Sequence, residues 1–213
     1  MSEFIDAIQQ GDVARVSALI ESDPALLQSQ DGPVTPLLLA IYHGKNDVAR
    51  LLVERGAPVA FAEACALGDL ALVQRMLDAD PNALHVRTAD GHVPLGLAIF
   101  FRHPDVARLL IERGADVNVP SENAQRVAPV HAAAAACDRA TMRLLLERGA
   151  DANARQQMDF TPMHGAASRG DIEMAKLLLE FGAERNPKAS DGQTPADAAR
   201  NHGHEEFADW IAG

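Results

Sequence analysis

The sequence predicts an all-α repeat solenoid, in which helix pairs stack in a row and each pair packs against its neighbours. Two recurring phrases carry this prediction. The first, Arg-Leu-Leu-x-Glu-Arg-Gly-Ala, begins at Arg50, Arg108 and Arg143, and a looser copy begins at Lys176. The second contains a proline, and the prolines of its last four copies are spaced 35, 33 and 33 residues apart. A fixed period in this range is typical of stacked repeats that bury their apolar faces only against one another.

The segment 156–186 indicates what one repeat forms. Thr161 followed by a proline predicts the start of a first helix, because the hydroxyl caps free N–H groups and proline fits the first helical position. The Ala-rich stretch that follows predicts a slim helix, which Gly170 ends. Asp171 predicts the start of a second helix with its apolar residues on one face, and Gly182 ends it. Each repeat is therefore expected to consist of helix, tight turn, helix and loop.

Alignment of the repeats on the turn between the two helices predicts seven helix pairs in a single domain. The residues aligned at this turn are Gly11, Gly44, Gly68, Arg102, Cys137, Gly170 and Gly203. The units implied are residues 1–29, 30–59, 60–87, 88–122, 123–155, 156–188 and 189–213. The first and last units match the repeat poorly, and we interpret them as caps with a solvent-facing outer side.

One connecting loop is too short. The step from Gly44 to Gly68 is 24 residues, whereas the other five steps are 33 to 35 residues. The shortfall lies at residues 57–60, in the loop that joins one pair to the next, which we call the finger. We therefore predict that this finger is missing, and that the next helix begins near residues 59–62 and ends by Gly68.

A longer period underlies the first one. Residues 4–59 resemble residues 61–117, and an Asp-Pro pair recurs at Asp23 and Asp80. We interpret this longer period as the duplication of an ancestral pair of repeats.

The two phrases resemble those of the ankyrin repeat, Thr-Pro-Leu-His-x-Ala-Ala followed by Leu-Leu-x-x-Gly-Ala-Asp-x-Asn. The resemblance covers essentially the whole chain and is most specific over residues 123–195. It implies that His131 and His164, at the fourth place of the proline phrase, hydrogen-bond the backbone of the loops. It also implies β-hairpin or loop fingers, and a concave side, formed by finger tips and first helices, that binds other proteins.

Composition and charge restrict the partners. The net charge is −11 and no basic stripe offsets it, which argues against nucleic-acid binding. No apolar run approaches the ~20 residues that a membrane helix requires, and the start of the sequence lacks the pattern of a secretory signal. Cys65 and Cys137 lie two repeats apart, too far for a disulfide in a stacked row, so we expect free thiols in core positions. Free thiols favour a reducing compartment, and we expect a cytoplasmic monomer.

No motif for catalysis or for a cofactor is present. The sequence lacks a phosphate-binding loop, a dinucleotide fingerprint and a nucleophile elbow, so we expect neither enzyme activity nor a cofactor. His202 and His204 form a lone His-x-His without a partner at ligand spacing, so we expect no metal site. The expected function is that of a non-catalytic scaffold for protein–protein interaction. Two alternatives stay open, namely a dedicated inhibitor or regulatory subunit of one enzyme and, more remotely, an enzyme with an unrecognised site.

The candidate binding residues lie at the ends of the first helices and on the fingers. The chain has seven Phe, one Tyr and one Trp, and several of these map to this concave side. Aromatic and arginine side chains are enriched at interface hot spots. We expect the missing finger to expose Leu67 and to open a pocket beside Tyr42 and Phe101, although Phe100 and Phe101 could instead fill space left by an irregular unit. The predicted binding residues are Tyr42, His43, Leu67, Phe100, Phe101, Arg102, Phe160, Ser168 and Arg169.

Overall fold

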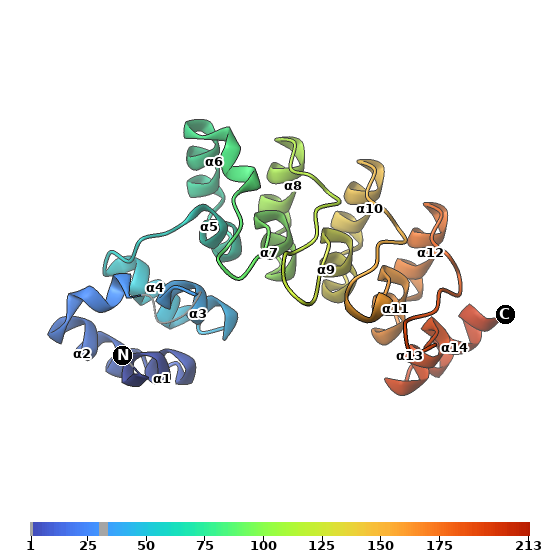
Figure 1. The fold of residues 1–213 in the computed structure, drawn as a ribbon, viewed down its shortest axis with the longest axis horizontal. Helices are drawn as coiled ribbons and strands as arrows, with labels where there is room; N and C mark the ends of the chain where they lie inside the picture. Colours follow the sequence, from blue (N-terminus) through green and yellow to red (C-terminus); the bar gives the residue numbers. More distant parts are fainter. Residues whose placement is uncertain (1, 30–33) are drawn as a thin grey trace.

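The computed structural model describes residues 2–29 and 34–213, and its fourteen α-helices follow one another as seven consecutive pairs (Figure 1). The predicted solenoid is confirmed, while the boundary predicted at residue 30 lies outside the described residues. No strand is assigned within the two described ranges, so the fingers are loops. The helices are α1 Ser2–Gln10, α2 Val13–Ser22, α3 Pro36–Tyr42, α4 Asn46–Glu54, α5 Phe61–Leu67, α6 Leu70–Ala79, α7 Pro94–Phe100, α8 Pro104–Glu112, α9 Pro129–Ala136, α10 Arg139–Glu147, α11 Pro162–Ser168, α12 Ile172–Glu180, α13 Pro195–Asn201 and α14 Glu205–Ala212.

The turn between the two helices of each pair has the same backbone conformation throughout. All seven aligned turn residues have a positive φ, including two that are not glycine, Arg102 at 63° and Cys137 at 55°. Glycine is favoured in this left-handed region because it has no Cβ. The alignment of the seven turns is therefore confirmed, including the two positions where the sequence lacks the expected glycine.

Helix starts follow the predicted capping chemistry. Thr35 Oγ1 accepts a hydrogen bond from Leu38 N at 3.0 Å, and Asp171 Oδ1 accepts one from Met174 N at 2.9 Å. Such side chains satisfy N–H groups that have no partner within the helix. Three further second helices are capped in the same way, by Asp12, Asp69 and Asp138.

The fingers that precede α7, α9, α11 and α13 are connected to one another in a row, which we call the finger ladder. One backbone hydrogen bond joins each finger to the next. These bonds run from Glu122 N to Gly91 O at 2.8 Å, from Gln157 N to Gln125 O at 2.8 Å and from Ser190 N to Met158 O at 2.9 Å. Asn118 Nδ2 and Asn153 Nδ2 each donate to a loop of the following pair, at 3.0 Å. These pairs are therefore linked by hydrogen bonds as well as by side-chain packing.

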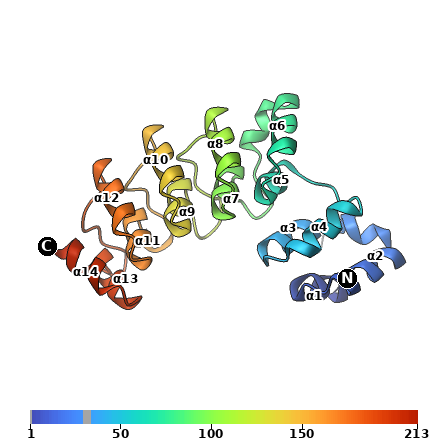
Figure 2. The ribbon, with the colours of Figure 1, turned by 180° about the vertical axis from the view of Figure 1, so that it is seen from behind.

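The stack changes direction between the second and third pairs. Helices α1–α4 lie across the direction followed by the later helices, in both the front and the rear view (Figures 1 and 2). Two hydrophobic cores meet at this junction, one centred on α1–α4 and the other running from α5 to α14. Helix α5 contributes to both, since Phe61 and Cys65 pack in the second core while Ala62 and Ala66 pack in the first.

The missing finger lies at this junction. Residues 57–60 contain no strand and lead directly into α5, which begins at Phe61 and ends before Gly68. The prediction of a deleted finger is confirmed.

Glu63 supplies a polar link between the two pairs that flank the missing finger. Its side chain is buried, at 2% exposure, and its Oε2 accepts a hydrogen bond from Ala60 N at 2.7 Å. Its Oε1 accepts a hydrogen bond from the hydroxyl of Thr35, which caps α3. A buried carboxylate is tolerated here because neighbouring donors satisfy both oxygens.

The two Asp-Pro pairs form equivalent structures. Each begins a short 3₁₀ helix, η1 at Pro24–Gln28 and η2 at Pro81–His85. In each, the preceding aspartate caps the helix, with Asp23 accepting from Ala25 N at 3.1 Å and Asp80 from Asn82 N at 3.0 Å. The longer sequence period therefore corresponds to a repeated local structure.

Candidate functional site

A cavity of about 470 Å³ opens across the first helices α7, α9 and α11, and we call it the α7–α11 cavity. Its walls come from these helices, from the fingers between them and from the end of α3. The lining residues are Tyr42, His92, Val93, Gly96, Leu97, Phe100, Phe101, Ser121, Gln125, Val127, His131, Ala132, Ala134, Ala135, Gln156, Thr161, Pro162 and Gly165.

An aromatic wall closes one side of the cavity. Tyr42 and Phe101 stack nearly parallel with ring centroids 6.2 Å apart, and Phe100 meets Phe101 edge-on at 5.1 Å. The His92 ring also meets Tyr42 edge-on, at 6.0 Å. Tyr42 and Phe101 are half-buried against the first core, whereas Phe100 is 60% exposed. The wall therefore has a packed inner part and one aromatic ring that is free to contact a partner.

Small residues make the room for the cavity. Gly96, Ala132, Ala135 and Gly165 line it from three successive first helices. Gly96 stands at the position that His131 occupies in the next pair, so this helix leaves open the space that a larger side chain would fill. Short side chains facing aromatic rings produce a hollow rather than an even surface.

The hydroxyl of Tyr42 lies near Asp90, in the finger that precedes α7. Burial raises the pKa of the Tyr42 phenol above its usual value, and the nearby Asp90 carboxylate raises it further. Neither Tyr42 Oη nor Asp90 Oδ1, both buried, has a hydrogen-bond partner among the described residues. The Tyr42 phenol is therefore neutral, and the residue forms part of the cavity wall.

His131 is a structural residue beneath the cavity. Its Nδ1 accepts a hydrogen bond from Ala128 N at 3.2 Å, and its Nε2 lies 3.0 Å from Ala154 O and 3.2 Å from Phe160 O. Nε2 therefore carries the proton and donates to both carbonyl groups. Burial lowers the pKa of His131 below its ordinary value, so the ring is neutral.

His164 repeats this arrangement one pair later. Thr161 N donates to its Nδ1 at 3.2 Å, and its Nε2 lies 3.1 Å from Gln193 O. Burial lowers the pKa of His164 as well. The loop-bridging role that the resemblance implies for both histidines is confirmed.

Comparison with family models agrees with this geometry. A model described as ankyrin repeats in three copies matches residues 4–121, 61–156 and 130–213. The chain belongs to the ankyrin repeat family. Ankyrin repeats generally mediate binding to other proteins, and the family is typically non-catalytic.

Two known ankyrin repeat proteins are similar to part of the chain. Ankyrin repeat and SOCS box protein 16 of Homo sapiens is 35% identical over 108 residues, which cover 47% of this chain and 23% of that protein. A protein of Treponema pallidum (strain Nichols) named for its ankyrin repeats is 35% identical over 127 residues, which cover 53% of this chain and 41% of that protein. The chain thus spans less than half the length of these relatives.

The structure brings three of the predicted binding residues of this ankyrin repeat chain together at the cavity, namely Tyr42, Phe100 and Phe101. Leu67 is not among the lining residues. Its side chain is half-buried and packs against the first core, so the missing finger leaves Leu67 partly exposed. The cavity does lie beside Tyr42 and Phe101, and from there it extends across α7, α9 and α11.

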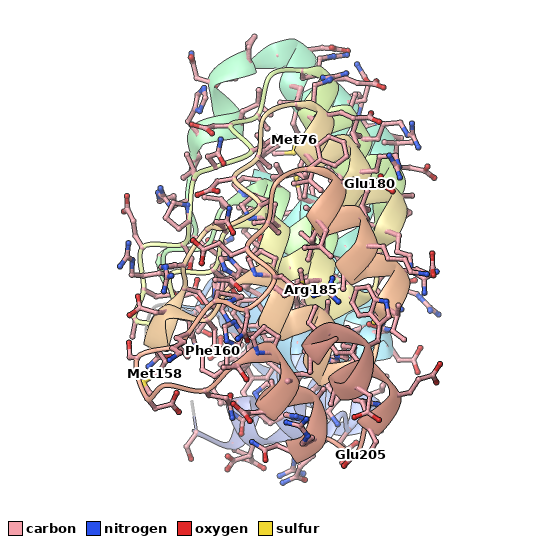
Figure 3. All side chains as sticks on the ribbon, turned by 90° about the vertical axis from the view of Figure 1, so that its right-hand side faces the viewer. Met76, Met158, Phe160, Glu180, Arg185 and Glu205 are labelled. Carbon is pink, nitrogen blue, oxygen red and sulfur yellow. The ribbon has the colours of Figure 1, made fainter. Side chains whose placement is uncertain are left out.

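The other predicted residues lie around the cavity without lining it. His43, Arg102 and Arg169 are exposed at the turns that end first helices, and Ser168 is half-buried at the end of α11. Phe160 is half-buried and meets the His164 ring at 5.0 Å. Phe160 and the neighbouring Met158 lie on the finger side of the molecule, opposite Glu180 of α12 (Figure 3).

Sequence reasoning missed the finger side of the cavity. Gln125 and Gln156 line it from two neighbouring fingers, and His92 from a third. One signal was present in the sequence, since Gly96 breaks the Thr-Pro-Leu-His phrase at its histidine. The loss of a large side chain at a repeated position indicates a local hollow.

The two cysteines and the His202-x-His204 pair do not line the cavity. Cys65 is buried, and burial raises the pKa of its thiol to about 12. The expectation that Cys137 is also a core residue is wrong, because its turn position leaves it exposed. His202 Nδ1 lies 2.8 Å from Ala198 O. Within residues 2–29 and 34–213, no group of three or more His, Cys, Asp and Glu side chains is placed to hold a metal.

None of the helices in the described parts of the chain combines the length and the apolar character needed to cross a membrane.

Proposed function

We propose that this chain is a non-catalytic scaffold that holds a partner protein on its concave side, through the α7–α11 cavity and the fingers around it. The observation that carries the proposal is the exposure of Phe100 beside an apolar cavity in a protein whose other large apolar side chains are mostly buried. Exposed aromatic side chains next to well-formed pockets are typical anchors of protein interfaces.

The rest of the molecule is compatible with this role. The net charge of −11 disfavours nucleic acid and anionic membranes as partners. We propose that the seven units act as one domain, as a monomer in the cytoplasm. The concave surface in this proposal includes the binding residues predicted from the sequence, with Leu67 half-buried.

The test is affinity purification of the partner from native cells, followed by cross-linking and mass spectrometry. We expect cross-links to the fingers and first helices. Phe100→Ala should weaken binding at least tenfold, which corresponds to about 1.4 kcal/mol, and should leave the thermal midpoint nearly unchanged because the ring is mostly exposed. Tyr42→Ala and Phe101→Ala should also weaken binding but lower the thermal midpoint, since both rings pack against the first core.

The matched control is Arg143→Ala on the second helix α10, which should not change the affinity. If cross-links and loss of binding concentrate on the second helices while Phe100→Ala binds normally, the proposed surface is wrong.

A further inference from the structure

We infer that the α7–α11 cavity takes an extended, acidic peptide segment of the partner, with a bulky apolar side chain inserted between the aromatic wall and α11. This inference rests on the proposed function and adds the chemistry and the conformation of the segment that binds. Three features of the described residues carry it: the shape of the cavity, two free carboxamides, and the charges beside it.

The shape of the cavity fits a bulky apolar side chain. About 470 Å³ lies within the range of sites that enclose small ligands, and most of its lining is apolar. Phe100 and Phe101 face it from one end, and Pro162 and Gly165 from the other. An aromatic or large aliphatic side chain would gain both burial and contact with the aromatic rings there.

Two glutamines on the finger side favour an extended main chain. Gln125 and Gln156 line the cavity, and among the described residues neither side-chain amide makes a hydrogen bond within the protein. A carboxamide offers both donors and an acceptor, which match the N–H and C=O groups of a peptide. In a helix these groups are already bonded to one another, whereas in an extended segment they are free. The two amides are therefore suited to an extended peptide.

The charges beside the cavity favour an acidic segment. Arg102, Arg126 and Arg155 are each next to a lining residue in the sequence, are exposed, and form no ion pair within the described parts of the chain, although Arg155 Nη1 donates a hydrogen bond to Lys188 O at 3.2 Å. Three carboxylates lie nearby. Glu122 pairs with Arg87 at 3.1 Å, Asp159 accepts a hydrogen bond from Ser190 at 2.6 Å, and Asp90 Oδ2 lies 3.7 Å from His92 Nε2.

The second helices show the opposite arrangement. The guanidinium groups of Arg113 and Arg143 reach carboxylates of neighbouring second helices, at 3.0 Å from Asp78 and 3.2 Å from Glu180. The arginines next to the cavity are complementary to Asp and Glu on a partner, and this local charge is opposite in sign to the net charge of −11.

The backbone around the cavity is fixed before any ligand arrives. Four of the five described non-glycine residues with positive φ adjoin the cavity or its fingers: Arg102, Arg126, Met158 and Asp159. The finger ladder connects the fingers that hold Arg126, Met158 and Asp159 through backbone hydrogen bonds. A preformed site loses less conformational entropy on binding a flexible peptide.

The experiment uses the full chain and a phage-displayed library of random linear 12-residue peptides. The leading sequence is then synthesised with a fluorescein label, and its affinity is measured by fluorescence anisotropy. We expect enriched sequences to combine one or two large apolar residues with flanking Asp or Glu. Enrichment of basic or uncharged sequences, or no enrichment above a bead-only control, would overturn the inference.

Two matched pairs of variants locate the site. Ala135→Trp fills the cavity and should weaken binding at least tenfold, whereas Ala140→Trp, on the exposed side of α10 in the same pair, should not. Arg126→Glu should weaken binding and reduce its salt dependence, whereas Arg75→Glu, at an exposed position of α6, should do neither. Equal affinity of the chain and its Ala135→Trp variant would overturn the inference.

A measurement on the unmodified chain covers the case in which Ala135→Trp does not fold. Bound peptide should slow hydrogen exchange in residues 119–127 and 153–161, and should leave the second helices unchanged. Protection confined to the second helices would overturn the inference. If the native partner cross-links to the concave side but no acidic peptide binds, this inference fails while the proposed function stands; cross-links confined to the second helices would remove both.

Discussion

The first two helix pairs and the five that follow obey the same repeat pattern but are joined to their neighbours differently. From α7 onward, the finger ladder and the asparagines after each Gly-Ala phrase connect one pair to the next. Between α4 and α5 the described residues contain no bond between fingers, and the connection depends on α5, Glu63 and the contact of Tyr42 with Phe101. The repeat phrase thus determines the structure of each helix pair, whereas the finger determines how one pair is connected to the next.

Truncation of a core leucine should have the largest effect, and it should distinguish the first two helix pairs from the five that follow. Leu52 and Leu145 are both fully buried, the first in the α1–α4 core and the second in the α5–α14 core. A Leu→Ala change at such sites costs about 2–5 kcal/mol of unfolding free energy. Measured by hydrogen exchange with mass spectrometry, Leu52→Ala should reduce protection in α1–α4 and Leu145→Ala in α7–α12. Equal loss of protection in all helices from either change would mean that the chain unfolds as one unit.

Loss of Glu63 should loosen the junction itself. Glu63→Ala leaves the Ala60 N–H and the Thr35 hydroxyl without their acceptor, at a cost of about 1–3 kcal/mol. We expect faster proteolysis within residues 55–60 and little change in the protection of α9–α14. Glu63→Gln keeps the size of the side chain and one acceptor oxygen, so it should restore part of the resistance. Proteolysis at the rate of the unmodified chain would show that packing alone holds the junction.

Acidification should destabilise the five later helix pairs more than the first two. Burial places the folded-state pKa of His131 and His164 below the ordinary value of about 6.5. As the pH falls, these two histidines therefore bind protons in the unfolded chain before they do so in the folded chain. Their contribution to the free energy of unfolding is complete above pH 6.5 and declines as the pH falls below that value. Leu38 takes the equivalent position in the second pair and does not titrate.

The free energies of opening, obtained from amide hydrogen-exchange rates corrected for intrinsic rates, should fall in α9–α12 when the pH is lowered from 7.5 to 5.5. They should change less in α1–α4. The His131→Gln/His164→Gln double variant should lose this difference. A decline of the same size in both regions would assign the pH dependence to other groups.

The smallest effects should come from ion pairs between second helices. Arg55 reaches Glu21 at 3.2 Å in the first region, and Arg143 reaches Glu180 at 3.2 Å in the second. Exposed pairs of this kind contribute about 0–1 kcal/mol. Arg55→Ala and Arg143→Ala should therefore shift urea midpoints little and by similar amounts. A clearly larger shift for Arg55→Ala would show that this pair compensates for the absent finger.

Most of the fold could be predicted because its signals are local. Thr35 and Asp171 cap helices through neighbouring N–H groups, and the turn residues adopt one backbone conformation, so each pair is specified within a few residues. The change of direction at α5 could not be predicted in this way. It depends on how one short helix divides its faces between two cores, which is a property of packing rather than of sequence period.

The candidate site could be predicted in part. Aromatic residues at the end of α7 mark the wall, and their type and position are visible in the sequence. The degree to which Leu67 is exposed could not be predicted from the missing finger alone, because the first core covers part of this side chain. Gln125 and Gln156 were missed because polar finger residues have no periodic signal, and only the arrangement of the fingers directs them to the cavity.

The position of the junction also has a mechanical consequence. Tension between the two ends of a solenoid acts equally on every junction between pairs, and it breaks first the junction where neighbouring pairs are least connected. That place is the loop before α5, so the first two pairs should detach while the finger ladder remains closed. Tyr42 belongs to α3, whereas the other rings of the aromatic wall belong to the later pairs. In an optical trap, the earliest extension step should therefore open one wall of the cavity and leave its floor intact, which would make peptide binding sensitive to force.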